Sequence, residues 1–182
     1  MTAERAIASR LAAVQADITT LALDAIVNAA NEPLIMGGGV DGAIRRKAGP
    51  DMERDLRQIG RCPAGEAIIT RGYRLPARFV IHTVAPVWSG SGMRTEEKER
   101  LLAACYASSL ALADTNAIDT IAFPCIGTGI YAWPAERAAD IAFSTVISHM
   151  KNTARPAKVT FCCFSPGDRE RYATAMAALA RS

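Results

Sequence analysis

Two glycine-rich segments in this sequence have the composition of loops that bind phosphate. Residues 37–41 read Gly-Gly-Gly-Val-Asp and lead into a helical pattern, and residues 125–131 read Cys-Ile-Gly-Thr-Gly-Ile-Tyr after an apolar run. Glycine leaves backbone N–H groups unobstructed, and the positive end of a following helix attracts an anion. A single glycine run fits a flexible turn equally well. Two such segments together predict a ligand with a diphosphate in its middle.

Polar and aromatic side chains stand beside these segments. Asn31 and Asp41 flank the first one, where a carboxamide can hold a sugar hydroxyl and a carboxylate can accept a proton from water. An aspartate at the start of a helix is also explained by the helix dipole alone. Asp17 can accept a hydrogen bond from an exocyclic amine such as that of adenine, or can cap the turn that follows it. Phe164 can stack on a base or pack in the core.

The histidines and cysteines do not suggest a metal centre. His82 alternates with apolar residues, as expected of a structural histidine in a strand, and His149 is expected to be a surface cation near a helix end. The five cysteines are odd in number and lack the spacing of metal ligands. Cys162 and Cys163 lie in an apolar run and are expected to be buried. Unpaired thiols of this kind are typical of a reducing cytoplasm.

The elements that must position these residues alternate between strands and helices. We expect strands at 11–16, 25–28, 67–70, 79–84, 120–125 and 158–164, and helices at 40–48, 51–59, 95–113, 134–150 and 168–180. Pro134 is expected to be the first residue of its helix. Alternation of this kind predicts a mostly parallel sheet covered on both faces. Ligands bind at the carboxyl ends of such strands, so the loops after Asn28, Cys125 and Phe164 should form the site.

Size and charge narrow the function further. A chain of 182 residues, half of them hydrophobic, fits one domain spanning 1–182, with residues 1–10 as a peripheral N-terminal extension. Its first residues do not resemble a signal peptide, and no stretch is long and apolar enough to span a membrane. The net charge is only +3, and the one run of three basic residues, 45–47, is typical of a solvated helix face. Nucleic acid is therefore not expected to be the main partner.

The sequence resembles the macrodomain family, and specifically its MacroD type, from about Ala13 to Arg181. The resemblance rests on five segments that occur in the family's order and spacing: residues 15–19 (QADIT), 27–31 (VNAAN), 37–44 (GGGVDGAI), 81–84 (IHTV) and 123–131 (FPCIGTGIY). An ordered set of this kind is far more specific than one glycine run. It implies the α/β class, and within it a three-layer α/β/α sandwich with a mixed central sheet.

The resemblance also implies a ligand and a reaction. Members of this type bind ADP-ribose without a cofactor, remove the acetyl group from O-acetyl-ADP-ribose and related O-acyl-ADP-ribose esters, and release ADP-ribose from acidic side chains of mono-ADP-ribosylated proteins. It assigns catalytic roles to the positions of Asn31, Asp41 and Tyr131. It assigns ligand binding to Asp17, Ile18, Gly37, Gly38, Gly39, Val40, Cys125, Ile126, Gly127, Thr128, Gly129, Ile130 and Phe164.

Three departures from the family pattern keep an alternative open. Met36 stands where the family often has a fourth glycine, Arg45 where it commonly has histidine, and Gly127 where it commonly has serine. We expect ligand binding to survive these changes, whereas hydrolysis depends on how they affect Asp41. A module that binds ADP-ribose without hydrolysing it is therefore the alternative. The segment 89–92 (SGSG) is expected to be a mobile loop that contacts the leaving group.

A dinucleotide-dependent reductase is a weaker alternative. The segment 127–132 matches the spacing of the dinucleotide-binding fingerprint, with glycine at 127 and 129 and alanine at 132. That fingerprint should open a fold and be followed by further strands. Here only one predicted strand follows, and Pro134 delays the helix. The context therefore disfavours nicotinamide chemistry.

Overall fold

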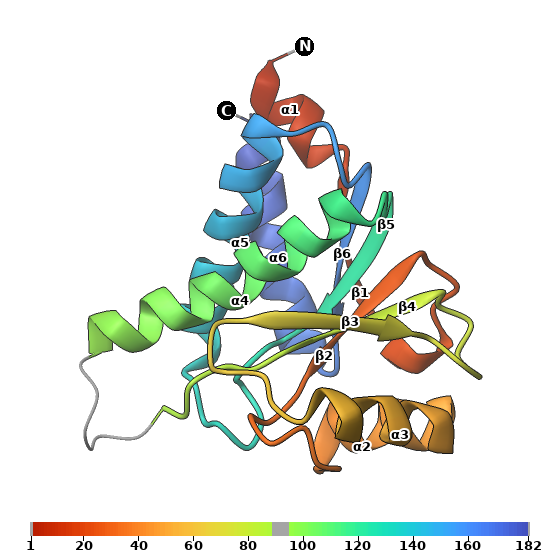
Figure 1. Ribbon diagram of the computed structural model, residues 1–182. Coiled ribbons are helices and arrows are strands. Elements are labelled where there is room, and N and C mark those ends of the chain that lie inside the picture. The colour runs from red at the N-terminus through yellow and green to blue at the C-terminus, as the bar shows by residue number, and fades with distance from the viewer. Residues whose placement is uncertain (1, 89–94, 182) are drawn as a thin grey trace.

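A computed structural model describes residues 2–88 and 95–181 and places six strands in one sheet (Figure 1). The segment 89–92 that was expected to contact the leaving group lies outside the described residues. The strand order is β1-β6-β5-β2-β4-β3, and only β3 runs antiparallel to its neighbour. The strands are β1 (Leu11–Gln15), β2 (Ala25–Ala29), β3 (Ala67–Arg71), β4 (Phe79–Thr83), β5 (Thr120–Pro124) and β6 (Lys158–Cys163). The prediction of a mixed sheet is confirmed.

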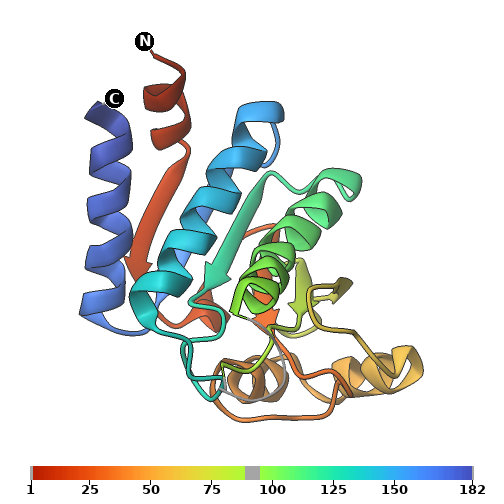
Figure 2. The same cartoon turned by 90° about the vertical axis from the view of Figure 1, so that its left-hand side faces the viewer.

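Helices cover both faces of this sheet (Figures 1 and 2). One face carries α1 (Ala3–Ala8), α4 (Thr95–Thr115), α5 (Ala135–Asn152) and α6 (Pro166–Arg181), and the other carries α2 (Gly39–Ala48) and α3 (Pro50–Ile59). Val27 of β2 packs in the core beneath the first group, and its neighbour Ile26 packs in the core beneath the second. Burial on both faces explains the continuous apolar strands. The three-layer α/β/α prediction is confirmed.

The N-terminal segment differs from the expectation of a peripheral extension. Residues 3–8 form α1, and the side chain of Ile7 is 5 % exposed within the larger core. The guanidinium of Arg10 donates hydrogen bonds to the carbonyl oxygens of Ala154 at 3.0 Å and Pro156 at 2.7 Å. A helix this short leaves too weak a pattern in the sequence to be predicted, because it is stabilised by packing against α5 and α6.

Two smaller expectations also need correction. Pro134 precedes α5 as its N-cap residue, and the helix itself begins at Ala135. The side chain of His149 is only 16 % exposed, and its Nε2 lies 3.3 Å from Asp114 Oδ2, because α4 and α5 pack side by side. His149 is thus a partner in an interhelical pair and not a solvated cation.

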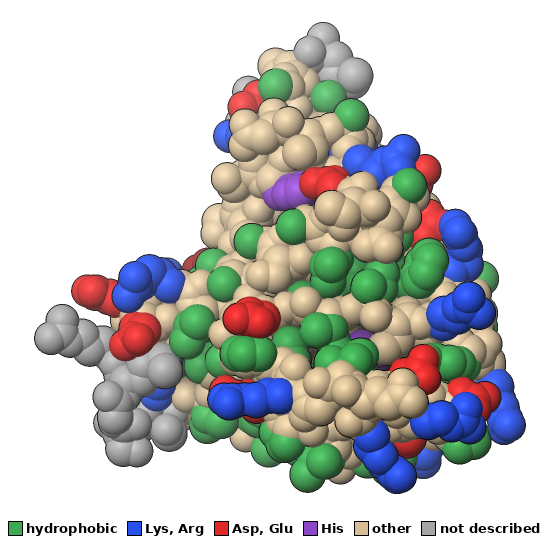
Figure 3. Space-filling model, in the orientation of Figure 1, with side chains coloured by type: hydrophobic (Ala, Val, Ile, Leu, Met, Phe, Trp, Pro, Cys, Tyr) green, Lys and Arg blue, Asp and Glu red, His purple; other side chains and the backbone are tan. Residues whose placement is uncertain are grey.

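The cysteines and the surface agree with the expectations from composition. Cys162 and Cys163 are buried as predicted, and all five cysteines are free thiols. One face of the molecule shows Lys and Arg side chains interspersed with Asp and Glu (Figure 3). Within the part of the chain that the structure describes, no helix combines the length and the hydropathy needed to cross a bilayer.

Candidate active site

The loops that carry the predicted site residues meet at the carboxyl ends of the parallel strands. Asp17 follows β1, Phe164 follows β6, the second glycine segment follows β5, and Asn31 follows β2. Because the strand order is β1-β6-β5-β2-β4, these loops form a row, with Asp17 and Phe164 at one end and Asn31 at the other. The side-chain amide of Gln15 donates to the carbonyl oxygen of Phe164 at 3.3 Å, which joins the first two strand ends.

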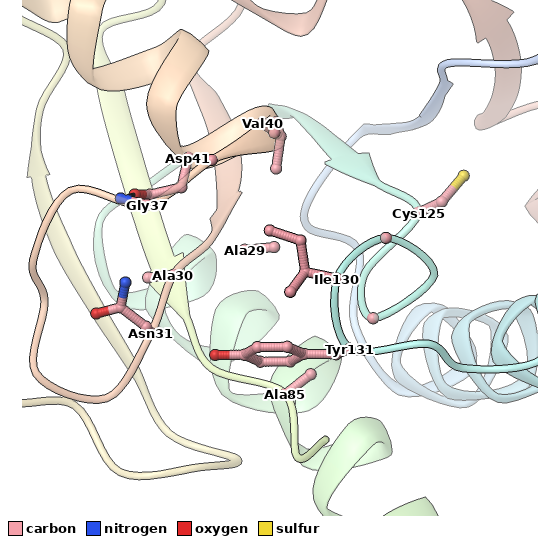
Figure 4. Close-up of a pocket in the computed structure, with 14 residues that line it drawn as sticks. Ala29, Ala30, Asn31, Gly37, Val40, Asp41, Ala85, Cys125, Ile130 and Tyr131 are labelled. Atoms are coloured by element: carbon pink, nitrogen blue, oxygen red, sulfur yellow. Dashed lines mark hydrogen bonds between the residues drawn. The ribbon is translucent and has the colours of Figure 1, made fainter. Parts of the chain in front are cut away.

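A cavity of about 180 Å³ lies between the two glycine segments (Figure 4). It encloses less volume than a typical pocket for a drug-sized ligand, so it can hold only one part of an extended ligand. Of the predicted residues, Asp17, Ile18, Ile126, Thr128 and Phe164 do not line it. The lining residues are Ala29, Ala30, Asn31, Gly37, Gly38, Gly39, Val40, Asp41, Ala85, Cys125, Gly127, Gly129, Ile130 and Tyr131.

The first glycine segment forms a turn that presents backbone N–H groups. Helix α2 begins at Gly39 with Gly38 as N-cap residue, and among the described residues no side chain caps this end. Its first N–H groups and its dipole therefore remain available to an anion. A Cβ atom added at Gly42 would lie 2.6 Å from the carbonyl oxygen of Gly37. Glycine at position 42 thus allows the turn to pass directly over the first turn of the helix.

Asp41 is almost completely buried, and three N–H groups orient its carboxylate. Its Oδ1 accepts from Asn28 Nδ2 at 2.7 Å and from Arg45 Nε at 2.9 Å, and its Oδ2 accepts from the backbone N–H of Gly37 at 2.7 Å. A Cβ atom added at Gly37 would lie 3.3 Å from Asp41 Oδ2 and 3.4 Å from Asn31 Nδ2. Oδ2 and the Asn31 amide therefore face the same small space in the cavity. An ionised carboxylate has about four acceptor positions, so about one remains for water or a hydroxyl group.

Arg45 overturns the interpretation of residues 45–47 as a solvated face. Its side chain is 1 % exposed, whereas Arg46 and Lys47 are exposed as expected. Besides Asp41, its guanidinium donates to the carbonyl oxygen of Leu34 at 3.2 Å and to Glu53 Oε1 at 2.8 Å. Burial acts to lower the pKa of Arg45, but its bonds to the two carboxylates outweigh burial and raise the pKa. The guanidinium therefore stays charged.

Asn31 holds the first loop in place. Its Nδ2 donates to the carbonyl oxygen of Ile35 at 2.8 Å, and its Oδ1 accepts from the N–H of Ile35 at 3.1 Å. One amide hydrogen of Asn31 remains for a ligand. The neighbouring Met36 is 50 % exposed and does not line the cavity, so it does not narrow it.

Tyr131 lies across the cavity from the first loop. In Figure 4 its hydroxyl points toward Asn31. Burial raises the pKa of Tyr131, and the nearby carboxylates of Glu32 and Asp41 add to this effect. The phenol is therefore neutral at physiological pH, and its ring provides a flat wall against which a sugar can pack.

The second glycine segment depends on two tryptophans. Gly127 has a φ of +87°, and a Cβ atom there would lie 2.6 Å from Trp133 Cδ1. The indole N–H of Trp133 donates to the carbonyl oxygen of Pro86 at 2.7 Å, and its ring lies 4.6 Å from that of Trp88. This packing explains why glycine stands at position 127, because a serine side chain would collide with Trp133. Ile130 is 78 % exposed and reaches across to Gly38, where the two loops meet.

The side chains of three predicted ligand-binding residues in this loop face away from the cavity. Ile126 is completely buried in the core, and the hydroxyl of Thr128 donates to the carbonyl oxygen of Cys125 at 2.9 Å. The sulfur of Cys125 points away from the cavity in Figure 4. Toward the cavity, this part of the loop therefore presents its backbone and not these side chains.

At the far end of the row, Asp17 and Phe164 lie outside the cavity. Asp17 Oδ1 accepts from the N–H and the hydroxyl of Thr19, at 2.9 Å and 2.7 Å, and these bonds lower the pKa of Asp17. The capping interpretation is therefore confirmed. Both of these bonds use Oδ1, and neither uses Oδ2. Ile18 is buried. Phe164 is 94 % exposed, which rules out core packing and leaves its ring available for stacking.

His82 is a structural histidine, as predicted, but it is connected to Asp41. Its Nδ1 lies 3.1 Å from Asn28 Nδ2, and its Nε2 lies 2.9 Å from Thr70 Oγ1. Since Asn28 Nδ2 is a donor, Nδ1 of His82 accepts and Nε2 carries the proton. Asn28 then bridges His82 and Asp41. In the sequence, Asn28 marks only the end of a strand, although a polar residue inside a buried strand is a signal for such a network.

His82 predicts a loss of stability in mild acid. Burial, with a smaller contribution from Arg45, lowers its pKa from 6.5 to about 3. Below pH 6.5 the unfolded chain binds a proton that the folded protein excludes, so the free energy of unfolding falls as pH drops toward 3. The slope from this residue approaches about 1.4 kcal/mol per pH unit. Urea unfolding between pH 7.5 and 4.5 should show a smaller slope for His82→Gln, and an equal slope would contradict this assignment.

Comparisons with known proteins agree with this geometry. The family described as Macro domain matches residues 27–142. A macro domain-containing protein of Chlorobaculum tepidum is 55 % identical over 91 % of this chain and 95 % of its own length. A Citrobacter rodentium protein named O-acetyl-ADP-ribose deacetylase is 47 % identical over 90 % of this chain and 93 % of its own. A crystal structure of a Trypanosoma brucei macrodomain in complex with ADP-ribose superposes with a TM-score of 0.86 at 39 % identity, covering 93 % of this chain and 70 % of the other.

Proposed function

The chain belongs to the macro domain family, and from that premise we propose that it binds ADP-ribose and hydrolyses ester-linked derivatives of it. The observation that carries the proposal is the placement of Asp41 Oδ2 and the Asn31 amide around one small space between the two glycine segments. The substrates are O-acetyl-ADP-ribose and other O-acyl-ADP-ribose esters, together with ADP-ribose joined to acidic side chains of proteins. The kinship with a protein named O-acetyl-ADP-ribose deacetylase supports this substrate class.

The row of loops sets the orientation of the ligand in this proposal. The adenine lies at the end formed by Asp17 and Phe164, where the carboxylate accepts from its amine and the exposed ring stacks on it. The diphosphate lies between the glycine segments and accepts from the N–H groups at the start of α2. The distal ribose then occupies the part of the cavity lined by Asn31 and Tyr131, with Asn31 donating to a hydroxyl group and Tyr131 packing against the sugar.

Hydrolysis requires one water molecule and no cofactor. Asp41 Oδ2 uses its remaining acceptor position to accept a hydrogen bond from a water molecule, which it either activates or orients toward the ester carbonyl carbon. In the second case the water is already held by a phosphate of the ligand. The water oxygen forms a bond to that carbon, and the bond between the carbonyl carbon and the ribose oxygen breaks. The ribose oxygen takes up a proton, and the products are the carboxylic acid and ADP-ribose. Tyr131 restricts the sugar to the orientation in which this attack is possible.

A binding module without turnover is the second candidate. It is favoured by the observation that both polar atoms of the Asn31 side chain, and both oxygens of Asp41, already bond to the protein. Such side chains would act only to shape the pocket. The same ligand would then be recognised on mono-ADP-ribosylated proteins without being released.

The decisive experiment incubates the purified protein with O-acetyl-ADP-ribose, follows the release of ADP-ribose, and measures ADP-ribose binding by calorimetry. The variant Asp41→Ala serves as the control for release that depends on Asp41. We expect binding and release by the wild-type protein, with release lost in the variant. Binding without release would support the module that only binds, and absence of both would refute the proposal.

The remaining partners and the location complete the proposal. Mono-ADP-ribosylated proteins are the macromolecular partners. Nucleic acid is not a main one, because the net charge is only +3 and the face in Figure 3 shows basic side chains interspersed with acidic ones. Five unpaired thiols fit a reducing compartment, so we also propose a cytoplasmic location.

A further inference from the structure

Arg45 is buried behind the cavity and touches the carboxylate that lines it. The guanidinium lies one helical turn after Asp41 on α2 and contacts three partners: Asp41 Oδ1, the carbonyl oxygen of Leu34, and Glu53 Oε1 of α3. It thereby joins the first loop and two helices. Arg45 does not line the cavity itself, so any effect on a ligand must pass through Asp41 or the loop.

The two oxygens of Asp41 have different surroundings. Oδ1 faces the interior, where Arg45 approaches from α2 and Asn28 from β2. Oδ2 faces the cavity and the Gly37 N–H. His82 holds Asn28 from the other side, so the donor on β2 is also restrained. A carboxylate bonded at both oxygens cannot rotate without breaking at least one charge-assisted or buried hydrogen bond.

We propose that Arg45 is a positioning residue for hydrolysis, which holds Asp41 Oδ1 so that Oδ2 keeps its place beside the distal ribose. The inference rests on the proposed function. The bond from Arg45 to Asp41 fixes the plane of the carboxylate, and the bond to Leu34 fixes the loop that carries Gly37. Asp41 Oδ2 and the Gly37 N–H that donates to it thus both depend on one guanidinium.

A purely stabilising role does not account for this arrangement equally well. Burying an ion pair costs desolvation that well-packed apolar residues avoid, so a buried pair is weak evidence for stability. The planar fork of arginine can reach three acceptors in fixed directions, whereas the lysine ammonium is a point charge on a flexible stem. The geometry at position 45 uses this difference, because its acceptors lie on three separate segments.

The test compares Arg45→Met, Arg45→Lys and Met52→Ala with the wild-type protein. Met52 is completely buried on α3 in the same core as α2 but is not among the lining residues, so Met52→Ala loosens the packing without removing a bond to Asp41. For each protein, kcat and KM are measured with O-acetyl-ADP-ribose, the dissociation constant with ADP-ribose, and the melting temperature by calorimetry.

We expect Arg45→Met to lower kcat by about 100-fold, because small displacements of a catalytic group have effects of this size. KM and the dissociation constant should change by less than about threefold, because the N–H groups at the start of α2 are held by the helix itself and the second glycine segment does not contact Arg45. Arg45→Lys should recover part of kcat, and Met52→Ala should keep it. Unchanged kcat in Arg45→Met, or an equal loss in Met52→Ala, would overturn the inference.

Two further outcomes are also decisive. If Arg45→Met does not fold, the comparison of Arg45→Lys with Met52→Ala replaces it, and a kcat in Arg45→Lys equal to that of the wild type would overturn the inference. If the wild-type protein binds ADP-ribose but releases nothing from the ester, the proposed function fails and this inference fails with it. If the wild-type protein hydrolyses the ester and the Arg45 variants have the same kcat, the proposed function stands and only this inference is refuted.

Discussion

Replacing Asp41 by alanine is expected to remove hydrolysis and to destabilise the fold at the same time. The first effect follows from losing the acceptor at Oδ2, since a positioned group that handles the attacking water contributes about 10²–10⁴-fold. The second effect follows from leaving the Nε of a fully buried Arg45 without its partner. Breaking a buried ion pair costs about 3 kcal/mol, toward the low end here because Glu53 still binds the guanidinium. Assays of ADP-ribose release measure the loss of hydrolysis, and urea unfolding measures the loss of stability.

Two control variants distinguish the effect of leaving a buried charge unpaired from the effect of removing any carboxylate. Asp51→Ala removes an exposed carboxylate that pairs with Arg54, and it should cost less than about 1 kcal/mol with full activity. The double variant Asp41→Ala with Arg45→Met should regain part of the lost stability, because it removes the unpaired charge, yet remain inactive. Wild-type turnover by Asp41→Ala would refute the role assigned to Asp41.

Replacing Gly127 by alanine is expected to distort the second glycine segment and weaken ADP-ribose binding by about tenfold or more. The new Cβ atom would lie 2.6 Å from Trp133 Cδ1, at a backbone φ of +87° that side chains rarely adopt. Strain of this kind costs about 1–3 kcal/mol, and the loop must either store it or move. Calorimetric titration with ADP-ribose measures the loss.

The same loop provides the matched control. A Cβ atom at Gly129 would meet no protein atom within 4 Å, so Gly129→Ala should keep the melting temperature and the tryptophan spectrum of the wild type. Trp88 and Trp133 are the only two tryptophans of the chain and both pack beside this loop, so intrinsic fluorescence reports its conformation. Equal spectra and affinities for wild type and Gly127→Ala would show that the contact with Trp133 does not shape the loop.

Periodicity and turn chemistry were enough to predict the strands and most helices of this protein. Segments such as 79–83 and 158–163 are rich in β-branched and apolar residues with only isolated polar ones, which indicates strands buried on both faces and hence a parallel sheet between helices. The glycine segments could also be recognised as turns, because glycine permits the tight backbone path and leaves N–H groups unobstructed. The short α1 was not predictable, since Ile7 is buried only by helices that lie far along the chain.

Side-chain partners were where sequence reasoning failed. Arg45 was expected to be solvated because it stands in a basic run, yet the carboxylates that neutralise it, Asp41 and Glu53, come from two helices whose packing is invisible in the sequence. The link from His82 through Asn28 to Asp41 joins adjacent strands to the start of a helix. Gly127 looked like the loss of a hydroxyl group, and only the position of Trp133 explained it.

The sequence by itself determined the residue types of this site: two turns that leave N–H groups free, an amide, a tyrosine, and a carboxylate in the first turn of a helix. Local rules suffice there, because a turn and a helix start are decided by neighbouring residues. The tertiary structure decided the strand order, which aligns Asp17, the two turns and Asn31 in a row. It also decided which charges are buried together. The strand order and the buried ion pairs both depend on contacts between segments distant in the chain, and these contacts form only when the layers pack.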